Sequence, residues 1–205
     1  MNPKLYDRAS ASIRFIMRTV WRAKAYGTEN VPPDGPLIVA CNHVSYLDPP
    51  GMGCFCPRRI SYMAKKELFA MPVLGPAIAA VGAYPVDRQG SAKAAIKRSL
   101  EVLQGGGCVG IFPEGTRNLT GEVQPQTGVA LLASLAKAPV VPACIVGSAH
   151  AMRLAPIKVA FGKPMALPAD RKATHDDLAK FTGDIMNAIH ELADSLREKG
   201  PHADT

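Results

Sequence analysis

Short, wholly apolar segments alternate with longer segments of helical periodicity, and this alternation limits the folds open to the chain. Leu37–Cys41 holds five apolar residues in a row, which is typical of a strand buried on both faces of a sheet. In residues 91–104, Ser91 is a suitable helix N-cap and the glycines at 105–107 end the helix. The sequence therefore predicts a single α/β domain with a mixed, largely parallel sheet flanked by helices. Further strands are expected at 60–64, 108–112, 140–146 and 157–161, and further helices at 5–22, 128–137 and after a Thr174 cap.

The N-terminal segment predicts an amphipathic helix with a strong local charge. Its apolar face holds Ile13, Ile16, Met17 and Val20, with Trp21 near the end of the helix. A second face carries Arg14, Arg18 and Arg22. Residues 1–24 hold six basic side chains against one acidic, so we expect peripheral docking on an anionic membrane surface. The alternative is a helix packed on the domain with a solvated basic edge.

The charge distribution and the cysteine count limit the cellular location and the classes of partner that we expect. The basic residues of 1–24 exclude a signal peptide or a membrane span there. Because the rest of the chain is nearly neutral and no aromatic residues interleave with basic ones, nucleic-acid binding is not expected. Five cysteines, an odd number, without a secretion signal indicate reduced thiols inside the cell.

Residues 68–86 carry no charged side chain and approach the length of a membrane span. Five helix-breaking residues interrupt the stretch: Pro72, Gly75, Pro76, Gly82 and Pro85. Such residues exclude a lipid-exposed helix, because the freed backbone groups find no partner in lipid. We expect an irregular segment that is either buried or faces the membrane, and that lines an acyl groove or only packs the core.

His43 and Asp48 follow directly after the first predicted strand, where active sites of α/β sheets collect. Their spacing does not place them on one helix face, so they meet only if the segment turns, as Pro49-Pro50 favours. If they meet, Asp48 fixes the tautomer of the imidazole and stabilises the imidazolium. The other ring nitrogen of His43 then acts as a general base.

Two more loops carry side chains suited to a phosphate. Phe112–Asn118 follows a predicted strand, and within it Gly115 permits close backbone approach while Thr116 offers a hydroxyl. Arg117, in the same loop, and Arg88, at the end of 82–88, supply planar forks for a phosphate monoester. The alternative is structural, with Arg88 paired to Asp87 and Arg117 to Glu114.

Together these segments resemble the glycerolipid acyltransferases, most closely the bacterial 1-acylglycerol-3-phosphate acyltransferases. The resemblance covers residues 37–147 and rests on the order and spacing of the motifs. His43 and Asp48 resemble the histidine-x4-aspartate motif, residues 82–88 the second motif, and residues 112–117 the third motif. Val141-Pro142 resembles the fourth motif, and residues 64–69 resemble the basic segment between the first two.

The resemblance implies a role for each of the motif residues. His43 is the base, Asp48 orients it, and the acceptor phosphate is held by a set of six residues: Lys65, Arg88, Glu114, Gly115, Thr116 and Arg117. The expected reaction moves a fatty acyl group from acyl carrier protein or coenzyme A to the free hydroxyl of a 1-acylglycerol 3-phosphate, making phosphatidic acid for phospholipid synthesis. No cofactor or metal is expected, and the protein would lie peripherally on the cytoplasmic face of the cell membrane. Glycerol 3-phosphate or another lysolipid is the competing acceptor.

This interpretation divides the chain into a membrane-docking helix at 1–26, an acyltransferase catalytic domain at 27–199 and a tail at 200–205. Two other functions stay open. Cys41 lies two residues from His43, and Cys54 and Cys56 follow, so an acyl-cysteine intermediate or a Cys/His zinc site is an alternative. A basic membrane-bound scaffold without catalysis is the other.

Overall fold

The computed structural model describes residues 3–72, 74–80, 82–86, 92–168 and 173–198. Seven strands form one sheet in the order β1-β7-β6-β2-β5-β3-β4. Their bounds are β1 Lys24–Tyr26, β2 Leu37–Cys41, β3 Ile60–Lys65, β4 Ala83–Val86, β5 Cys108–Ile111, β6 Val140–Val146 and β7 Lys158–Phe161. The five strands from β6 to β4 run parallel, whereas β7 is antiparallel to β6 and carries β1 parallel to itself. The predicted mixed, largely parallel sheet is confirmed.

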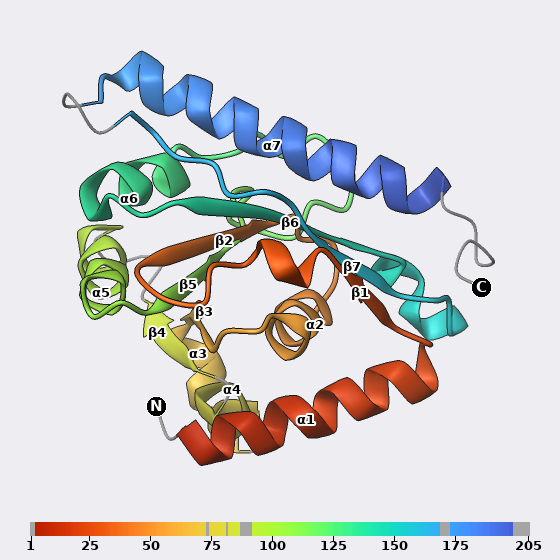
Figure 1. The fold of residues 1–205 in the computed structure, drawn as a ribbon. Coiled ribbons are helices and arrows are strands. Elements are labelled where there is room, and N and C mark those ends of the chain that lie inside the picture. The colour runs from red at the N-terminus through yellow and green to blue at the C-terminus, as the bar shows by residue number, and fades with distance from the viewer. Residues whose placement is uncertain (1–2, 73, 81, 87–91, 169–172, 199–205) are drawn as a thin grey trace.

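Helices cover both faces of the sheet (Figure 1). The α-helices are α1 Pro3–Val20, α2 Asp48–Phe55, α3 Lys66–Phe69, α4 Leu74–Ala80, α5 Ala92–Gln104, α6 Gly128–Ala136 and α7 His175–Glu198. Two 3₁₀ segments add η1 Thr28–Asn30 and η2 Ser148–Arg153. One face packs against α5, α6 and α7, and the other against α1 and α2, so the domain has three layers.

Strand β2 shows why its sequence is apolar throughout. Alternate residues of a strand point to opposite faces of a sheet. Leu37, Val39 and Cys41 belong to the core under α1 and α2. Ile38 and Ala40 belong to the core under α5, α6 and α7. A strand in the middle of a doubly covered sheet therefore has no polar face.

The predicted strands and long helices are confirmed with small shifts at their ends. The cap of the last helix also forms as expected: the Asp177 backbone N–H donates to Thr174 Oγ1 at 3.2 Å, and the Thr174 backbone N–H donates to Asp177 Oδ2 at 2.8 Å. Ser91 and the tail at 200–205 lie outside the described residues, so predictions about them stay open.

The prediction of an irregular segment at 68–86 is wrong. The described part contains the end of α3, helix α4 and strand β4. Gly75 and Pro76 are the second and third residues of α4, and proline is tolerated in a first turn because its missing N–H has no helical partner there. Pro85 lies in β4, at one end of the strand order, where a proline is compatible with a sheet.

The N-terminal helix forms, but its predicted apolar face is divided. Met17 is buried and Ile13 packs against the core, while Ile16 and Val20 are exposed. Two of the predicted basic residues turn toward α2: Arg14 Nε donates to the carbonyl of Cys54, and the Arg18 guanidinium lies 5.8 Å from the Phe55 ring centre. Among the described helices, none combines the length and apolarity needed to cross a bilayer.

Candidate active site

The five parallel strands bring the sequence motifs to one edge of the sheet. Strand β2 leads into His43, and its neighbour β5 leads into Phe112 and the loop beyond. The carboxyl ends of parallel strands share an edge, which is where α/β proteins bind ligands. The first and third motifs, about seventy residues apart in sequence, are therefore adjacent because β2 and β5 are adjacent.

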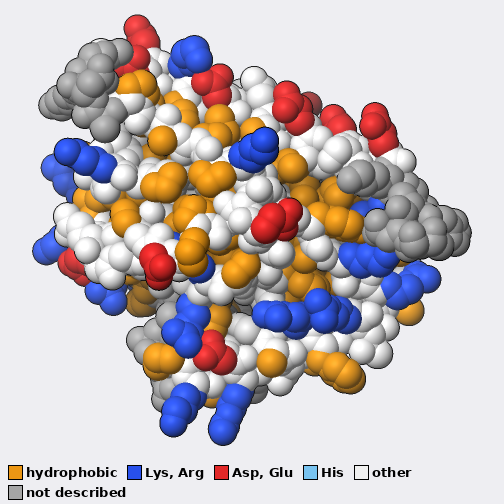
Figure 2. All heavy atoms as spheres, viewed as in Figure 1, with side chains coloured by type: hydrophobic (Ala, Val, Ile, Leu, Met, Phe, Trp, Pro, Cys, Tyr) orange, Lys and Arg blue, Asp and Glu red, His pale blue; other side chains and the backbone are white. Residues whose placement is uncertain are grey.

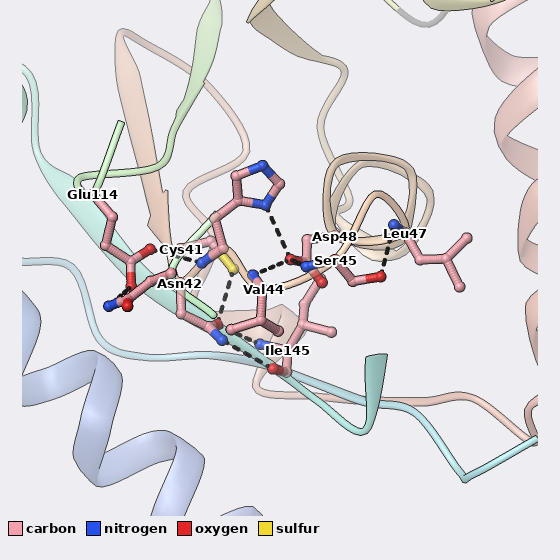
Figure 3. Close-up of polar contacts among 10 residues, drawn as sticks. Cys41, Asn42, Val44, Ser45, Leu47, Asp48, Glu114 and Ile145 are labelled. Atoms are coloured by element: carbon pink, nitrogen blue, oxygen red, sulfur yellow. Dashed lines mark hydrogen bonds and ion pairs between the residues drawn. The ribbon is translucent and has the colours of Figure 1, made fainter. Parts of the chain in front are cut away.

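Asp48 is the centre of the first motif (Figure 3). Its side chain is fully buried, and Oδ2 lies 3.0 Å from His43 Nδ1. The same oxygen accepts the backbone N–H groups of Val44 and Ser45, both at 2.7 Å. A carboxylate only accepts hydrogen bonds, so Nδ1 carries the hydrogen when Asp48 is ionised. The predicted meeting of His43 and Asp48 is present in the structure.

A helix start, rather than a helix break, makes this meeting possible. The backbone turns after β2, with the Asp48 N–H donating to the Ser45 carbonyl at 3.2 Å. Asp48 is the first residue of α2, and Pro49 and Pro50 occupy its first turn. The pair Pro49-Pro50 was expected to mark a turn or break beyond the motif. The segment does turn, and the proline pair then begins α2 rather than breaking a helix, because proline favours the backbone angles of a first helical turn.

The imidazole of His43 is held on one side and open on another. Its ring stacks on Phe112 at 4.3 Å between centroids with an interplanar angle of 26°. The side chain keeps 16% of its surface exposed. Nε2 makes no hydrogen bond to the described residues, so this nitrogen is the one available to a ligand. A histidine with Nδ1 bound to a buried carboxylate and a reachable Nε2 can accept a proton from a hydroxyl.

Two further side chains fix the backbone on either side of His43. Glu114 Oε2 accepts the His43 backbone N–H at 2.8 Å, and the Asn118 backbone N–H donates to the His43 carbonyl at 2.7 Å. Asn42 spans to β6, where its Oδ1 accepts the Ile145 N–H at 2.8 Å and its Nδ2 donates to the Ile145 carbonyl at 3.1 Å. The histidine is thus held between the strands on both sides of β2.

Glu114 is buried and its carboxylate is occupied by protein groups. In addition to the His43 N–H, it accepts a hydrogen bond from Asn118 Nδ2 at 3.3 Å. Burial raises the pKa of Glu114, and the hydrogen bonds oppose that rise. Among the described residues it forms no ion pair with Arg117, so the structural pairing considered from sequence is absent.

Arg117 instead lies over an aromatic ring of the first motif. Its guanidinium carbon is 3.9 Å from the centre of the Tyr46 ring. Thr116 is exposed beside it. Gly115 has φ +67°, and a Cβ there would lie 3.0 Å from the Gln126 side chain. A left-handed backbone in close contact favours glycine, so Gly115 shapes the loop that presents Thr116 and Arg117.

Of the other two cationic residues predicted for the phosphate, Lys65 and Arg88, the structure describes only Lys65. Lys65 ends β3, where its backbone pairs in register with Val86 at the end of β4. It therefore stands at the same edge of the sheet as His43. Arg88 lies outside the described residues, so its predicted position stays a prediction.

The cysteines do not gather around His43. All five are free and buried. Cys41 lies on β2, facing the core under α1 and α2, and its burial raises the pKa of the thiol well above its usual range. In the part of the chain that the structure describes, no three His, Cys, Asp or Glu side chains are grouped to hold a metal ion.

Sequence reasoning missed the partners that hold the site. Asn42, Tyr46 and Asn118 lie in the motif segments, but no role was predicted for them. The roles of Asn42 and Asn118 depend on strand neighbours, and that of Tyr46 on a loop from another strand. The one signal in the sequence was the position of Asn42 at the end of a predicted strand, next to His43. Asparagine side chains at such positions often form hydrogen bonds with nearby backbone groups.

The fold and the His43–Asp48 pair define an α/β protein whose sheet carries, at its carboxyl edge, a histidine oriented by a buried aspartate, as in enzymes that use histidine as a general base. The family model described as Acyltransferase matches residues 22–146. The chain belongs to this Acyltransferase family. The match confirms the resemblance found in the motifs, and the matched stretch ends with β6.

Individual relatives agree with this assignment. The chain is 32% identical over 198 residues to the 1-acyl-sn-glycerol-3-phosphate acyltransferase of Bacillus subtilis (strain 168), covering 94% of this chain and 98% of that protein. It is 27% identical over 182 residues to the protein of the same name from Streptococcus pneumoniae, covering 86% and 68%. The human alpha protein of that name is 35% identical over 125 residues, covering 59% of this chain and 44% of that protein.

A solved structure shares the fold. The 1-acyl-sn-glycerophosphate (LPA) acyltransferase PlsC of Thermotoga maritima aligns with a TM-score of 0.69 and 23% identity. The alignment covers 89% of this chain and 79% of that one. The agreement of the two folds supports the sheet order and the helical layers described above.

Proposed function

We propose that this acyltransferase moves a fatty acyl group from an acyl thioester to the free hydroxyl of 1-acylglycerol 3-phosphate, making phosphatidic acid. The observation that carries the proposal is the contact of 3.0 Å between His43 Nδ1 and Asp48 Oδ2, beside the loop that presents Arg117. The names of the relatives supply the acceptor, because the Bacillus subtilis and Streptococcus pneumoniae proteins are both 1-acyl-sn-glycerol-3-phosphate acyltransferases.

The chemistry needs no nucleophile from the protein. His43 Nε2 takes the proton of the acceptor hydroxyl as its oxygen attacks the thioester carbonyl carbon. The C–O bond forms, the C–S bond breaks, and the imidazolium returns the proton to the departing thiolate. Asp48 keeps Nδ1 protonated and stabilises the positive charge while it exists. General-base help of this kind contributes about 10²–10⁴-fold in rate.

We assign binding of the acceptor phosphate to the residues at the end of the third motif, where Arg117 lies. Arg117 offers a planar fork, and Lys65 and Arg88 are the further cations proposed from sequence. Thr116 and the Gly115 backbone complete the proposed cradle. Glu114 was grouped with these residues, but its hydrogen bonds to His43 and Asn118 support a positioning role.

The donor and the cellular setting belong to the same proposal. Acyl-acyl carrier protein and acyl-coenzyme A both present the required thioester. The proposed membrane contact is the exposed side of α1, on an anionic bilayer at the cytoplasmic face of the cell membrane. Residues 1–26 then act as the docking helix and residues 27–199 as the catalytic domain. Acylation of glycerol 3-phosphate and a scaffold without catalysis are the competing functions.

The charge distribution supports that orientation. Helix α7, on the opposite side of the sheet from α1, holds six acidic side chains against two basic. Figure 2 shows acidic side chains mostly along the edge that α7 occupies, whereas basic side chains lie over the α1 side and also along the other edges of this face. An anionic surface attracts the basic side and repels the acidic one.

Purified protein would be incubated with an acyl thioester and, separately, with monoacylglycerol phosphate, the matching monoacylglycerol and glycerol 3-phosphate. Products would be identified by mass. The proposal predicts phosphatidic acid as the main product and weak acylation of the acceptor without phosphate. Equal use of both monoacyl acceptors would contradict the phosphate assignment, and preference for glycerol 3-phosphate would establish the competing acceptor.

A truncated protein beginning at residue 25 tests the docking helix. It should bind anionic vesicles more weakly than the full chain, and added salt should weaken binding of the full chain, because each basic residue near such a surface contributes about 1 kcal/mol. Equal co-sedimentation of a folded truncated protein would exclude residues 1–24 as the anchor.

A further inference from the structure

The segment from Gly147 to Leu154, here called the η2 loop, exposes apolar side chains without an evident partner. Met152 is 97% exposed and Leu154 is 54% exposed. Leu154 also has φ +53°, a left-handed backbone that leucine adopts at a cost. The loop therefore holds two large apolar groups in water, one of them on a strained residue, and strain of this kind is often retained at functional positions.

The η2 loop is fixed to the end of α1. Trp21, the residue just after α1, donates from Nε1 to the Ala151 carbonyl at 2.9 Å, and its own carbonyl accepts the Ile157 N–H at 3.1 Å. Arg22 Nη2 lies 3.4 Å from the Leu154 carbonyl. At the base of the loop, a Cβ on Gly147 would clash with the Pro156 carbonyl. The Trp21 indole thus joins the loop to the end of the helix.

The same loop belongs to the edge of the sheet that carries the site. It follows β6, which runs parallel to β2. Ile145, near the end of β6, is the residue whose backbone is held by the Asn42 side chain, next to His43. In Figure 1 the segment near residue 150 lies beside the C-terminal end of α1. The η2 loop is thus connected both to the proposed docking helix, through Trp21 and Arg22, and to the His43 segment, through β6.

Apolar and basic groups continue from α1 onto the loop. On α1, the exposed apolar side chains are Leu5, Phe15, Ile16 and Val20. Near the junction, Arg22 adds positive charge, and Arg153 is exposed within the loop itself. Apolar side chains flanked by cations suit the interface of an anionic bilayer, where the former enter the acyl region and the latter meet headgroups.

We infer that the η2 loop is a second membrane-inserting element, which acts with α1 to bind an anionic bilayer and to turn the His43 edge of the sheet toward it. The apolar face of a helix on a membrane sets its rotation only loosely, and a second inserted contact on the same domain fixes the orientation of the domain more firmly. The inference rests on the proposed function, since a lipid acceptor must reach His43 from the bilayer.

The test replaces Met152 by Gln and Leu154 by Asn in the full chain. Asparagine tolerates the left-handed backbone at 154, so the fold should be kept. Leu135→Gln is the matched control, because Leu135 is also 54% exposed but lies on α6, before β6 begins. Co-sedimentation with vesicles of phosphatidylcholine and phosphatidylglycerol should weaken about tenfold or more for the double variant, since it removes two apolar side chains from the interface, and should not change for the control.

A direct readout uses Met152→Cys labelled with an environment-sensitive fluorophore, with Leu135→Cys as its control. The five native cysteines are buried, so labelling should favour the new thiol. Emission from position 152 should shift to the blue on adding anionic vesicles, and emission from position 135 should not. KM should rise for an acceptor embedded in vesicles but stay unchanged for a short-chain acceptor dissolved in water.

Equal vesicle binding by the folded double variant, with an unshifted probe at 152, would overturn the inference. A second result would also overturn it: the wild type and the Leu135→Gln control form a dimer in analytical ultracentrifugation, and the double variant does not. The loop would then be covered by a second copy of the chain. Failure of the proposed function has a different signature. It would appear as no transfer by the wild type to any acceptor while vesicle binding still depends on the loop.

Discussion

The guanidinium of Arg117 rests 3.9 Å above the ring of Tyr46. The two residues come from different motifs, Tyr46 from the turn between β2 and α2 and Arg117 from the loop after β5. Ring stacking leaves the edge of the guanidinium, with its N–H groups, available to a ligand. Tyr46 therefore positions the arginine that we assign to the acceptor phosphate.

Replacing Tyr46 by Leu should raise KM for the phosphorylated acceptor by about two- to fivefold, because an exposed cation–π contact contributes about 0.5–1 kcal/mol. Tyr46→Phe keeps the ring and should behave as the wild type. Steady-state kinetics with acceptor and donor varied separately would check this. A Tyr46→Leu protein with an unchanged acceptor KM, or with an equal rise for the donor, would exclude the positioning role.

Asn42 should contribute to stability as well as to the placement of His43. Its side chain satisfies both backbone groups of Ile145, and leaving such groups unpaired costs about 1–3 kcal/mol. Asn42→Ala should lower the free energy of unfolding in urea by about that amount. Asn187→Ala, at an exposed position of α7, is the control. Equal stability of both variants would show that the bridge to β6 is dispensable.

The thiol alternative gives a separate prediction. Burial raises the pKa of Cys41 well above its usual range, so the thiol is protonated at neutral pH and is a poor nucleophile. Cys41→Ala should keep measurable turnover. Loss of all activity in a folded Cys41→Ala protein would revive an acyl-cysteine intermediate, and stoichiometric zinc by elemental analysis would revive the metal alternative.

Glu114 should make the free energy of unfolding depend on pH. Burial raises its pKa above 4.5 in the folded state, so the native protein binds the proton more tightly than the unfolded chain. The contribution of this group to stability is therefore greatest below pH 4.5 and falls as the pH rises through the raised pKa. Urea unfolding at several pH values should show wild type losing stability relative to Glu114→Gln across that window. A gain with rising pH would contradict the sign.

Much of the fold could be predicted because burial on both faces leaves a mark in the sequence. Strands β2, β5 and β6 are apolar runs of strand length, and long helices show a periodic stripe. Strand β1 has only three residues and was not predicted, because so short a segment shows no pattern. Helix α2 was missed because prolines that begin a helix look the same in sequence as prolines that end one.

The site was predictable where one segment carries both partners. His43 and Asp48 lie in one short segment, so the contact could be predicted on the condition that this segment turns. The contacts of Tyr46 with Arg117 and of Asn42 with Ile145 join distant segments, and only the strand order determines them. The division of the apolar face of α1 between core and solvent could not be predicted for a related reason. Helical periodicity shows that an apolar face exists but not whether protein or lipid covers it.

The central claim is that His43 acts as the general base of an acyl transfer. The most direct measurement is the turnover of His43→Ala with thioester and monoacylglycerol phosphate at saturation. His175→Ala, whose side chain is largely exposed at the start of α7, is the control. Both variants should fold as the wild type does by circular dichroism. The account predicts a loss of at least about 100-fold for His43→Ala and none for the control, whereas near-normal turnover in a folded His43→Ala protein would contradict it.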